Sequence, residues 1–377
     1  MKVGIITYHG AHNYGSALQT YALWNAVKNE GHNVEVINYR TLRQDDLYRL
    51  YSKPNKIMNI VRNAQSFVYK NDLVKHHCKF ESFLSDNIVL SDKEIRDKNE
   101  LVELNHIYDC FICGSDQIWN PNCIDFDSSY LLDFVSDKSK CFSYAPSIAS
   151  NCIDEKWKKC FHDNLVLFSD LSIREDSGGK IISEITSRKV KTVLDPVFLL
   201  SDSYWKNISS DSMSYAGIKS EYILCYFIGD IPGMRKYAKE LGKKYKLPII
   251  VININLRDLK MNCIKRYDCG PLDFVDLIYN AKIICTNSFH AISFSLLFDK
   301  EFHAFVDNTH ENSAKSRITD ILKTLNMECR LVDNCSEILP SMEKGDFDYH
   351  DKLDLYILAS KKYLKEALSK VDSNRRS

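Results

Sequence analysis

Short strand-like runs rich in β-branched residues alternate with helical stretches along this chain, and that alternation constrains the fold more than any other feature. The chain opens with a strand-like run at residues 2–8 and a helical run at 14–29 that stops before Gly31. A second strand-like run follows at 33–39. Two strands joined by a helix run parallel, because the helix returns the chain to the starting edge. The opening segment therefore predicts a parallel sheet.

The same alternation continues to the end of the chain in two series separated by a Ser-rich stretch at 207–221, which we interpret as a connection. Strand-like runs of the first series follow a charged insertion at about 40–100, and they are 107–113, 140–147, 171–175 and 190–200. Those of the second series are 222–229, 247–253, 281–288 and 302–305. Each series has the pattern of a doubly wound α/β domain.

We therefore expect an α/β fold with two Rossmann-like domains that face each other across a cleft. The first spans 1–206 and carries a mostly helical insertion at about 40–100. The second spans 222–350. Apolar residues recur on one helical face of the tail, so residues 351–377 should form a helix that packs back on the body.

Composition excludes several classes of protein. Lys plus Arg and Asp plus Glu both number 50 among 377 residues, so no net charge attracts nucleic acid or anionic lipid. The 13 cysteines form no regular framework, which favours a reducing compartment. There is no signal-peptide pattern and no apolar run long enough to span a membrane. We expect a cytoplasmic protein, with peripheral contact at the inner membrane face left open and no oligomeric state defined.

Polar residues crowd the turn that follows the first strand-like run. Asn13, Tyr14 and Gly15 lie there, directly before a helix N-terminus. Unpaired N–H groups at such a terminus favour anions. The turn has neither the glycine spacing of a dinucleotide fingerprint nor the Gly-Lys-Ser/Thr of a P-loop. We predict a substrate-binding turn, and the alternative is a helix cap that happens to be polar.

A second polar turn follows the strand-like run at 107–113. Gly114 allows close approach of the backbone, and Ser115, Asp116 and Gln117 supply polar atoms. Trp119 could form the wall of a sugar pocket. The alternative is a turn with a packed tryptophan. Ligands bind beyond the carboxyl ends of parallel strands, so this turn belongs with the predicted substrate site.

A third turn, at the end of the strand-like run at 281–288, contains Asn287, Ser288 and Phe289 and leads into His290. The helix dipole disfavours a protonated histidine at this position, and a bound phosphate or carboxylate would offset that penalty. The position therefore favours an anionic ligand. The alternative is a histidine packed in the core.

Arg174 lies at the end of a strand-like run, and Arg317 lies near a helix start. In either position a guanidinium could hold a carboxylate or phosphate. The alternative for Arg174 is an ion pair with Glu175 or Asp176. No metal site is predicted. Cys110 and Cys113 are spaced to point to opposite faces of a strand, and His9 and His12 lack identifiable further ligands.

Several of these segments together resemble the polysaccharide pyruvyl transferase family. They are GIITYHGAHNYGSALQTYAL (4–23), YDCFICGSDQIWNP (108–121), LSIRE (171–175), VLDPVFLL (193–200) and TNSFHAISFSLLFDKEF (286–302). The resemblance implies a glycosyltransferase-B-like pair of domains. It also implies transfer of a pyruvyl group from phosphoenolpyruvate to two sugar hydroxyls as a ketal, in the synthesis of capsule or other surface polysaccharide. The family's histidine corresponds to His290, and its cationic donor contact to Arg174.

The sequence departs from the family pattern at one point. Several members have Arg-Leu-His where this chain has Ser288-Phe289-His290, and that arginine helps to hold the donor. Arg174, Arg317 or Lys315 could replace it, or the donor could differ.

We hypothesise that His290 is the general acid, Asp116 the general base and Arg174 the donor clamp. This chemistry needs no metal and no cofactor beyond phosphoenolpyruvate as the donor substrate. The acceptor is a sugar, and a lipid-linked oligosaccharide is one form of it. Two alternatives are a nucleotide-sugar glycosyltransferase of the same fold and a non-catalytic protein that binds glycan or a partner in an envelope-assembly complex.

Overall fold

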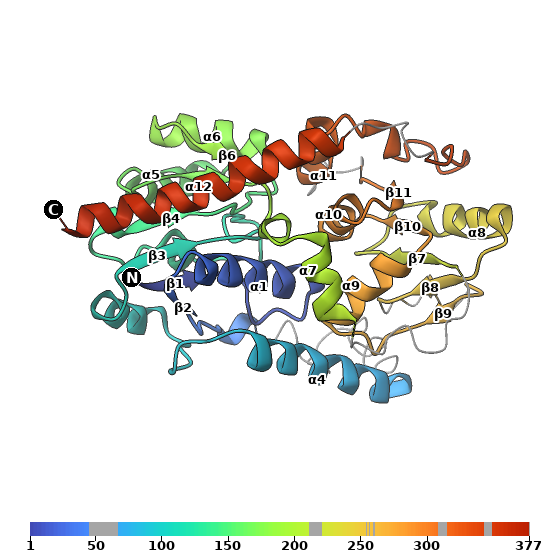
Figure 1. Ribbon diagram of the computed structural model, residues 1–377, viewed down its shortest axis with the longest axis horizontal. Helices are drawn as coiled ribbons and strands as arrows, with labels where there is room; N and C mark the ends of the chain where they lie inside the picture. Colours follow the sequence, from blue (N-terminus) through green and yellow to red (C-terminus); the bar gives the residue numbers. More distant parts are fainter. Residues whose placement is uncertain are drawn as a thin grey trace.

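The computed structural model contains two parallel sheets that lie side by side (Figure 1). It describes residues 1–44, 67–210, 221–253, 255, 257–258, 261–307, 315–342 and 349–376. Part of the expected insertion, 45–66, and most of the expected connection, 211–220, lie outside these residues.

The first sheet has the strand order β2-β1-β3-β4, and the second has the order β11-β10-β7-β8-β9. A short third sheet pairs β5 with β6. The strands of the first sheet are β1 (Lys2–Ile6), β2 (Asn33–Val36), β3 (Cys110–Cys113) and β4 (Cys141–Ser143). Those of the second are β7 (Ile223–Tyr226), β8 (Ile249–Val251), β9 (Ile264–Lys265), β10 (Ile283–Thr286) and β11 (Glu301–Ala304). The remaining pair is β5 (Ser172–Ile173) and β6 (Lys191–Thr192).

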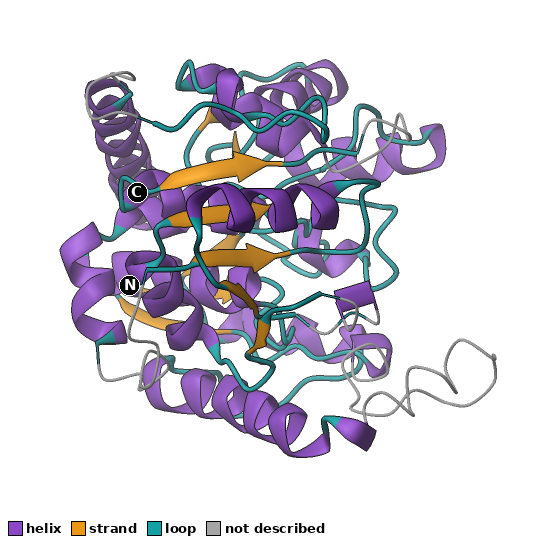
Figure 2. Cartoon of the chain, turned by 90° about the vertical axis from the view of Figure 1, so that its right-hand side faces the viewer, coloured by secondary structure: helices purple, strands orange, loops and turns teal. Residues whose placement is uncertain are grey.

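Helices lie on both sides of the strands (Figure 2). The α-helices are α1 (Tyr14–Asn29), α4 (Lys70–Asn87), α5 (Glu155–Leu165), α6 (Asp176–Thr186), α7 (Asp202–Ser209), α8 (Met234–Tyr245), α9 (Pro271–Asn280), α10 (Phe289–Leu297), α11 (Lys315–Thr324) and α12 (His350–Arg376). The 3₁₀ helices are η1 (Lys98–His106), η2 (Ser128–Leu131), η3 (Lys138–Lys140), η4 (Pro196–Leu199) and η6 (Glu328–Arg330). With helices on both faces, the central strands β3, β7 and β10 are buried along their whole length, as is typical of parallel sheets.

Alternate residues of each central strand face different cores. In β3, Cys110 and Ile112 belong to a cluster that both sheets share, whereas Phe111 and Cys113 belong to a cluster on the other face of the first sheet. This confirms the expectation that the two cysteines point to opposite faces. In the second sheet, Leu224 of β7 contributes to the shared cluster.

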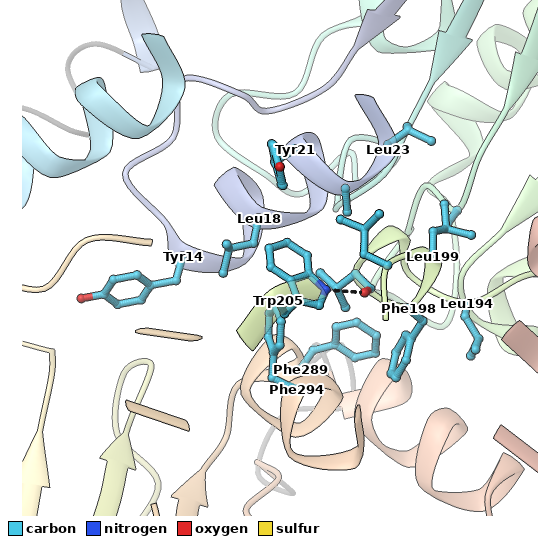
Figure 3. Packing of buried hydrophobic residues seen from close by; sticks show 14 of the residues in the cluster. Tyr14, Leu18, Tyr21, Leu23, Leu194, Phe198, Leu199, Trp205, Phe289 and Phe294 are labelled. Atoms are coloured by element: carbon cyan, nitrogen blue, oxygen red, sulfur yellow. Dashed lines mark hydrogen bonds between the residues drawn. The ribbon is translucent and has the colours of Figure 1, made fainter. Parts of the chain in front are cut away.

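The shared cluster joins the two halves through helices from both. Leu18 of α1, Trp205 of α7 and Phe294 of α10 lie together in it (Figure 3). The indole Nε1 of Trp205 donates to the carbonyl of Val197 at 2.9 Å, so the buried tryptophan leaves no polar atom unpaired. This shared core holds the carboxyl ends of the two sheets against each other.

None of the described helices is both long enough and apolar enough to cross a lipid bilayer.

Candidate functional site

The carboxyl ends of the two sheets border one cavity of about 450 Å³. On the first sheet it is lined by the turns after β1 and β3, and on the second by the turns after β7, β10 and β11. Within each sheet the strand order reverses between the neighbouring strands β1 and β3, and between β7 and β10. Ligands of doubly wound sheets bind at such reversal points, so both sheets direct their ligand-binding edge into the same space.

Eight of the fourteen residues predicted from the sequence line this cavity. They are Asn13, Asp116, Gln117, Asn287, Ser288, Phe289, His290 and Arg317. Gly15 borders it through contact with His290. The other five predicted residues, Tyr14, Gly114, Ser115, Trp119 and Arg174, are not among the lining residues.

His290 lies where the two halves of the molecule meet. It occupies the first turn of α10, where the Ser288 hydroxyl caps the helix by accepting from the Ala291 N–H. Its ring packs on Gly15 in the first turn of α1, so closely that a Cβ on Gly15 would lie 1.9 Å from Nδ1. Asn13 caps α1 by accepting from the N–H groups of Gly15 and Ser16. The N-termini of two helices, one from each half, therefore converge on this imidazole.

A buried carboxylate, Asp195, holds the other edge of the His290 ring. Its Oδ2 lies 3.3 Å from Nε2 of His290 and 2.5 Å from Nη1 of Arg174. Burial by itself would raise the pKa of Asp195, but the neighbouring His290 and Arg174 hold that pKa well below its usual range. From the sequence, a bound anion is expected to offset the helix dipole at His290, and in the structure Asp195 already places a negative charge beside the ring.

Asp195 was not predicted as a site residue. It precedes Pro196 at the start of η4, where its Oδ1 accepts from the Val197 N–H at 3.1 Å. In the sequence, Asp195 belongs to an Asp-Pro pair inside the strand-like run at 190–200, and such a pair is common at helix starts for capping alone.

Arg174 does not face the cavity as a donor clamp would. Its side chain is 2% exposed and pairs with Asp195, and the guanidinium lies 4.4 Å from the centre of the Phe289 ring. The alternative prediction, an ion pair with Glu175 or Asp176, is also wrong, because Arg174 pairs with Asp195, 21 residues further along the chain. Arg174 therefore holds Asp195, and through it His290, in place.

Arg317 of α11 is the one Arg or Lys side chain among the described residues that line the cavity. Its guanidinium lies 5.9 Å from the Phe289 ring centre. With the Gln117 amide oriented to satisfy both groups, the Gln117 oxygen accepts from Arg317 at 3.1 Å. Burial, followed by the charge of Arg174, lowers the pKa of Arg317 to about 10, so the side chain remains a cation at neutral pH. The side chain of Lys315 lies outside the described part of the chain.

Asp116 contributes a carboxylate from the first sheet. It accepts from the Ser16 hydroxyl and, at 2.8 Å, from the Gln117 N–H, and one oxygen lies 3.8 Å from Nη2 of Arg174. Its φ of 72° is in the left-handed region, which aspartate tolerates better than most residues. The strained backbone and these three contacts fix the carboxylate at the cavity wall.

Trp119 and Tyr14 were predicted to bind substrate, and both have structural positions instead. Trp119 is fully buried in the core on the outer face of the first sheet and donates to the Tyr130 carbonyl. The hydroxyl of Tyr14 donates to the carbonyl of Cys269 at 3.2 Å, and its ring stacks on Phe274. An apolar ring is more stable in a core than at a wet turn, so packing determines both positions.

Gly114 and Ser115 are also structural. A Cβ on Gly114 would lie 1.9 Å from the carbonyl oxygen of Tyr144, so glycine is needed for the approach of β4. The Ser115 hydroxyl is fully buried and donates to the Ala145 carbonyl at 2.5 Å. The two residues therefore shape the turn that presents Asp116.

Two strand-end turns that line the cavity were not predicted from the sequence. They are residues 305–307, after β11, and residues 228–231, after β7. Asn287 holds this turn to the turn after β10 through two hydrogen bonds, since its Oδ1 accepts from the Ile228 N–H at 2.7 Å and its Nδ2 donates to the Ile228 carbonyl at 2.6 Å. Gly229 and Asp230 in the stretch Phe-Ile-Gly-Asp could have identified the turn.

Comparison with known proteins assigns the chain to a family. The model of the family described as polysaccharide pyruvyl transferase matches residues 13–309. This range contains the residues that line the cavity, except Tyr8 before it and Arg317 and Ile318 of α11 after it. The chain belongs to the polysaccharide pyruvyl transferase family. No curated protein matches it in sequence.

Solved structures resemble this member of the polysaccharide pyruvyl transferase family in fold. UDP-GlcNAc 2-epimerase from Methanocaldococcus jannaschii has a TM-score of 0.50 at 13% identity, covering 95% of this chain and 99% of the epimerase. The enzyme from Neisseria meningitidis, bound to UDP-GlcNAc, has a TM-score of 0.49 at 13% identity, with coverages of 98% and 100%. Escherichia coli ADP-heptose heptosyltransferase II has a TM-score of 0.39 at 11% identity, covering 100% of both chains. The expected glycosyltransferase-B-like α/β fold is confirmed.

Proposed function

We propose that this protein transfers a pyruvyl group from phosphoenolpyruvate to two hydroxyls of a sugar, as a ketal, during synthesis of a surface polysaccharide. One observation carries the proposal: in a chain of this family, the histidine of the family motif borders the shared cavity and is held by Asp195 and Gly15. A fixed imidazole in a partly enclosed cavity is suited to deliver a proton to a bound donor.

The reaction needs one proton delivered to carbon and two removed from oxygen, one from each sugar hydroxyl. His290 donates a proton to the methylene carbon of the donor, while a sugar hydroxyl adds to the neighbouring carbon. Asp116 accepts the proton of that hydroxyl. A second hydroxyl of the same sugar then displaces phosphate, which leaves with the electron pair of the broken C–O bond and accepts the proton of that second hydroxyl. The C–O bond to phosphate breaks and two C–O bonds to the sugar form. Neither metal nor redox cofactor takes part.

Binding of a donor with a phosphate and a carboxylate needs positive charge in the cavity. The arginine that several family members carry two residues before this histidine is Ser288 here. Arg317 is the described cation that lines the cavity, beside Phe289 and Gln117. We therefore assign donor anchoring to Arg317 together with the N-termini of α1 and α10. Arg174 is assigned only the positioning of Asp195.

The remaining carboxylates of the cavity are suited to the acceptor. Asp116, Asp125, Asp230 and Asp307 line it. Carboxylates accept hydrogen bonds from sugar hydroxyls, and they would repel the donor phosphate. The proposal therefore puts the donor near Arg317 and His290, and the sugar, free or linked to lipid, along these aspartates.

The test is release of inorganic phosphate from phosphoenolpyruvate in the presence of nitrophenyl glycosides or lipid-linked oligosaccharides. His290→Ala should lower the rate by about 10²–10⁴-fold, because a general acid contributes that much. The matched control is His162→Ala, in an exposed position on α5, which should keep the wild-type rate. Circular dichroism checks that both variants fold. A wild-type rate in folded His290→Ala would remove His290 from the chemistry.

A nucleotide-sugar transferase of the same fold is the second candidate, favoured by the serine at position 288, where several family members carry the arginine that helps to hold the donor. A thermal-shift assay distinguishes the two proposed functions, because a ligand raises the thermal midpoint of the folded protein according to its concentration relative to its dissociation constant. Stabilisation by phosphoenolpyruvate supports the first proposal, and stabilisation by a nucleotide sugar alone supports the second. A protein that only binds glycan would release phosphate from neither donor.

A further inference from the structure

Two histidines and a glutamate from different parts of the chain meet outside the cavity. His12 belongs to the turn between β1 and α1, and His77 and Glu81 lie four residues apart on α4, which puts them on one helical face. The Nδ1 atoms of His12 and His77 are 3.2 Å apart, and Nε2 of His12 is 2.8 Å from Oε1 of Glu81. One ligand atom from each residue can be chosen so that all lie within 4.8 Å of one another.

These residue types and spacings suit a divalent cation of the zinc class. Imidazole and carboxylate are ordinary ligands of Zn²⁺, Co²⁺ and Ni²⁺. In a tetrahedral zinc site, ligand atoms about 2.0–2.1 Å from the metal lie about 3.3 Å apart, close to the separation of the two histidine nitrogens. Oε1 of Glu81 lies at Nε2 of His12 rather than at Nδ1, and because this flexible side chain is 41% exposed, it can turn toward a metal held by the two Nδ1 atoms.

The surroundings orient the three side chains and leave one side open. Nη2 of Arg40 lies 3.6 Å from Oε2 of Glu81, which leaves Oε1 toward His12. The ring of Phe80 lies 5.4 Å from that of His12 and forms an apolar wall. His77 is exposed, so solvent or a fourth ligand can reach this side. Outer contacts of this kind fix the orientation of ligands in metal sites.

We propose that His12, His77 and Glu81 bind a divalent cation of the zinc class, with the remaining coordination position open to solvent. This differs from the expectation of no metal, which followed because the sequence offered His12 no further ligands. The metal would join α4 to the turn that carries Asn13 and Gly15. It would therefore stabilise the part of the candidate site nearest to His290, without taking part in the chemistry.

The test is titration of the full-length protein with Co²⁺ after removal of bound metal by a chelator. Visible absorption bands of tetrahedral cobalt report the site, and the absence of near-ultraviolet thiolate bands excludes binding to the 13 cysteines. We expect one equivalent to bind without thiolate bands. His77→Ala and Glu81→Gln should each weaken binding by about tenfold or more. His162→Ala, which changes an exposed histidine beside Asp163, should bind as wild type does.

A second readout is the thermal midpoint, which Zn²⁺ should raise in wild type and in His162→Ala but not in His77→Ala. Three results would overturn the proposal: bands from thiolates alone, equal binding by wild type and His77→Ala, or no tetrahedral bands. In each of these, the three side chains form only a hydrogen-bonded chain, in which His12 donates from Nε2 to Glu81. None of these readouts depends on the transferase activity.

Discussion

Gly15 is the single residue on which the geometry of the site most depends. The ring of His290 occupies the space that any side chain on Gly15 would need. From the sequence, Gly15 is predicted only as part of a substrate-binding turn. In the structure, the group that approaches the backbone is a side chain from the other sheet. The contact ties the position of the imidazole to the start of α1.

Replacing Gly15 by alanine should therefore displace His290. We expect the free energy of unfolding to fall by about 1–3 kcal/mol, because an extra methyl group is forced into a filled space. We also expect kcat to fall more than that loss of stability explains. Gly179→Ala is the matched control, since its Cβ would lie no closer than 3.3 Å to the Ile173 side chain and 3.9 Å to the Thr192 hydroxyl. Phosphate release and urea unfolding measure both effects, and an unchanged kcat in folded Gly15→Ala would contradict the assigned contact.

Among the helices, α1 and α10 join the two halves by different parts of their surfaces. Their N-termini meet at His290, while Tyr14 of α1 reaches over to the second sheet and donates to the Cys269 carbonyl. Phe289 of α10 reaches in the other direction, where the Arg174 guanidinium stacks on it. Each helix thus places one aromatic side chain in the opposite half, and the polar first turns are left facing the cavity.

Tyr14→Phe tests whether Tyr14 joins the halves or binds substrate. We expect the free energy of unfolding to fall by about 0.5–1.5 kcal/mol, the usual contribution of one hydrogen bond, with KM unchanged. Tyr363→Phe makes the same chemical change at a buried hydroxyl that donates to the Ser143 carbonyl, and it should have the same effect on unfolding. A KM raised about tenfold in Tyr14→Phe alone, about 1.4 kcal/mol of lost binding, would restore the prediction made from the sequence.

Across the whole molecule, α12 connects the two sheets along one side (Figure 1). At its start, the hydroxyl of Tyr349 donates to the Leu296 carbonyl of α10. Further along, the Ser360 hydroxyl accepts from the Leu194 N–H, and Tyr363 reaches β4. The expected docking of the tail thus has a specific form, because the helix contacts elements of both halves.

Leu364→Ala should destabilise both halves together. Leu364 is 3% exposed in the shared cluster, and removing such a side chain usually costs about 2–5 kcal/mol. Leu358→Ala changes the same residue type on the same helix, at a position that is 63% exposed, and should cost less than about 0.5 kcal/mol. Urea unfolding followed by tryptophan fluorescence and by circular dichroism measures the difference. A loss confined to one of two separate transitions would contradict a core that both halves share.

Local sequence patterns determined the type of sheet and several of the residues that line the cavity. The alternation of strand-like runs and helices predicted two parallel sheets, because the side-chain period and the crossover length depend only on neighbouring residues. The rule that ligands bind beyond strand ends led to Asn13, Asp116 and His290, which line one cavity. The family motif added the expected reaction, which phosphate release now has to test.

Only the tertiary structure decided which side chains face that cavity. Trp119 and Arg174 lie close in sequence to turns of the site, yet packing buries the first and Asp195 holds the second. Asp195 is far in sequence from His290, and His77 and Glu81 of α4 are far in sequence from His12. Contacts between such segments depend on how the two halves pack, and burial and charge pairing decide that only after the chain has folded.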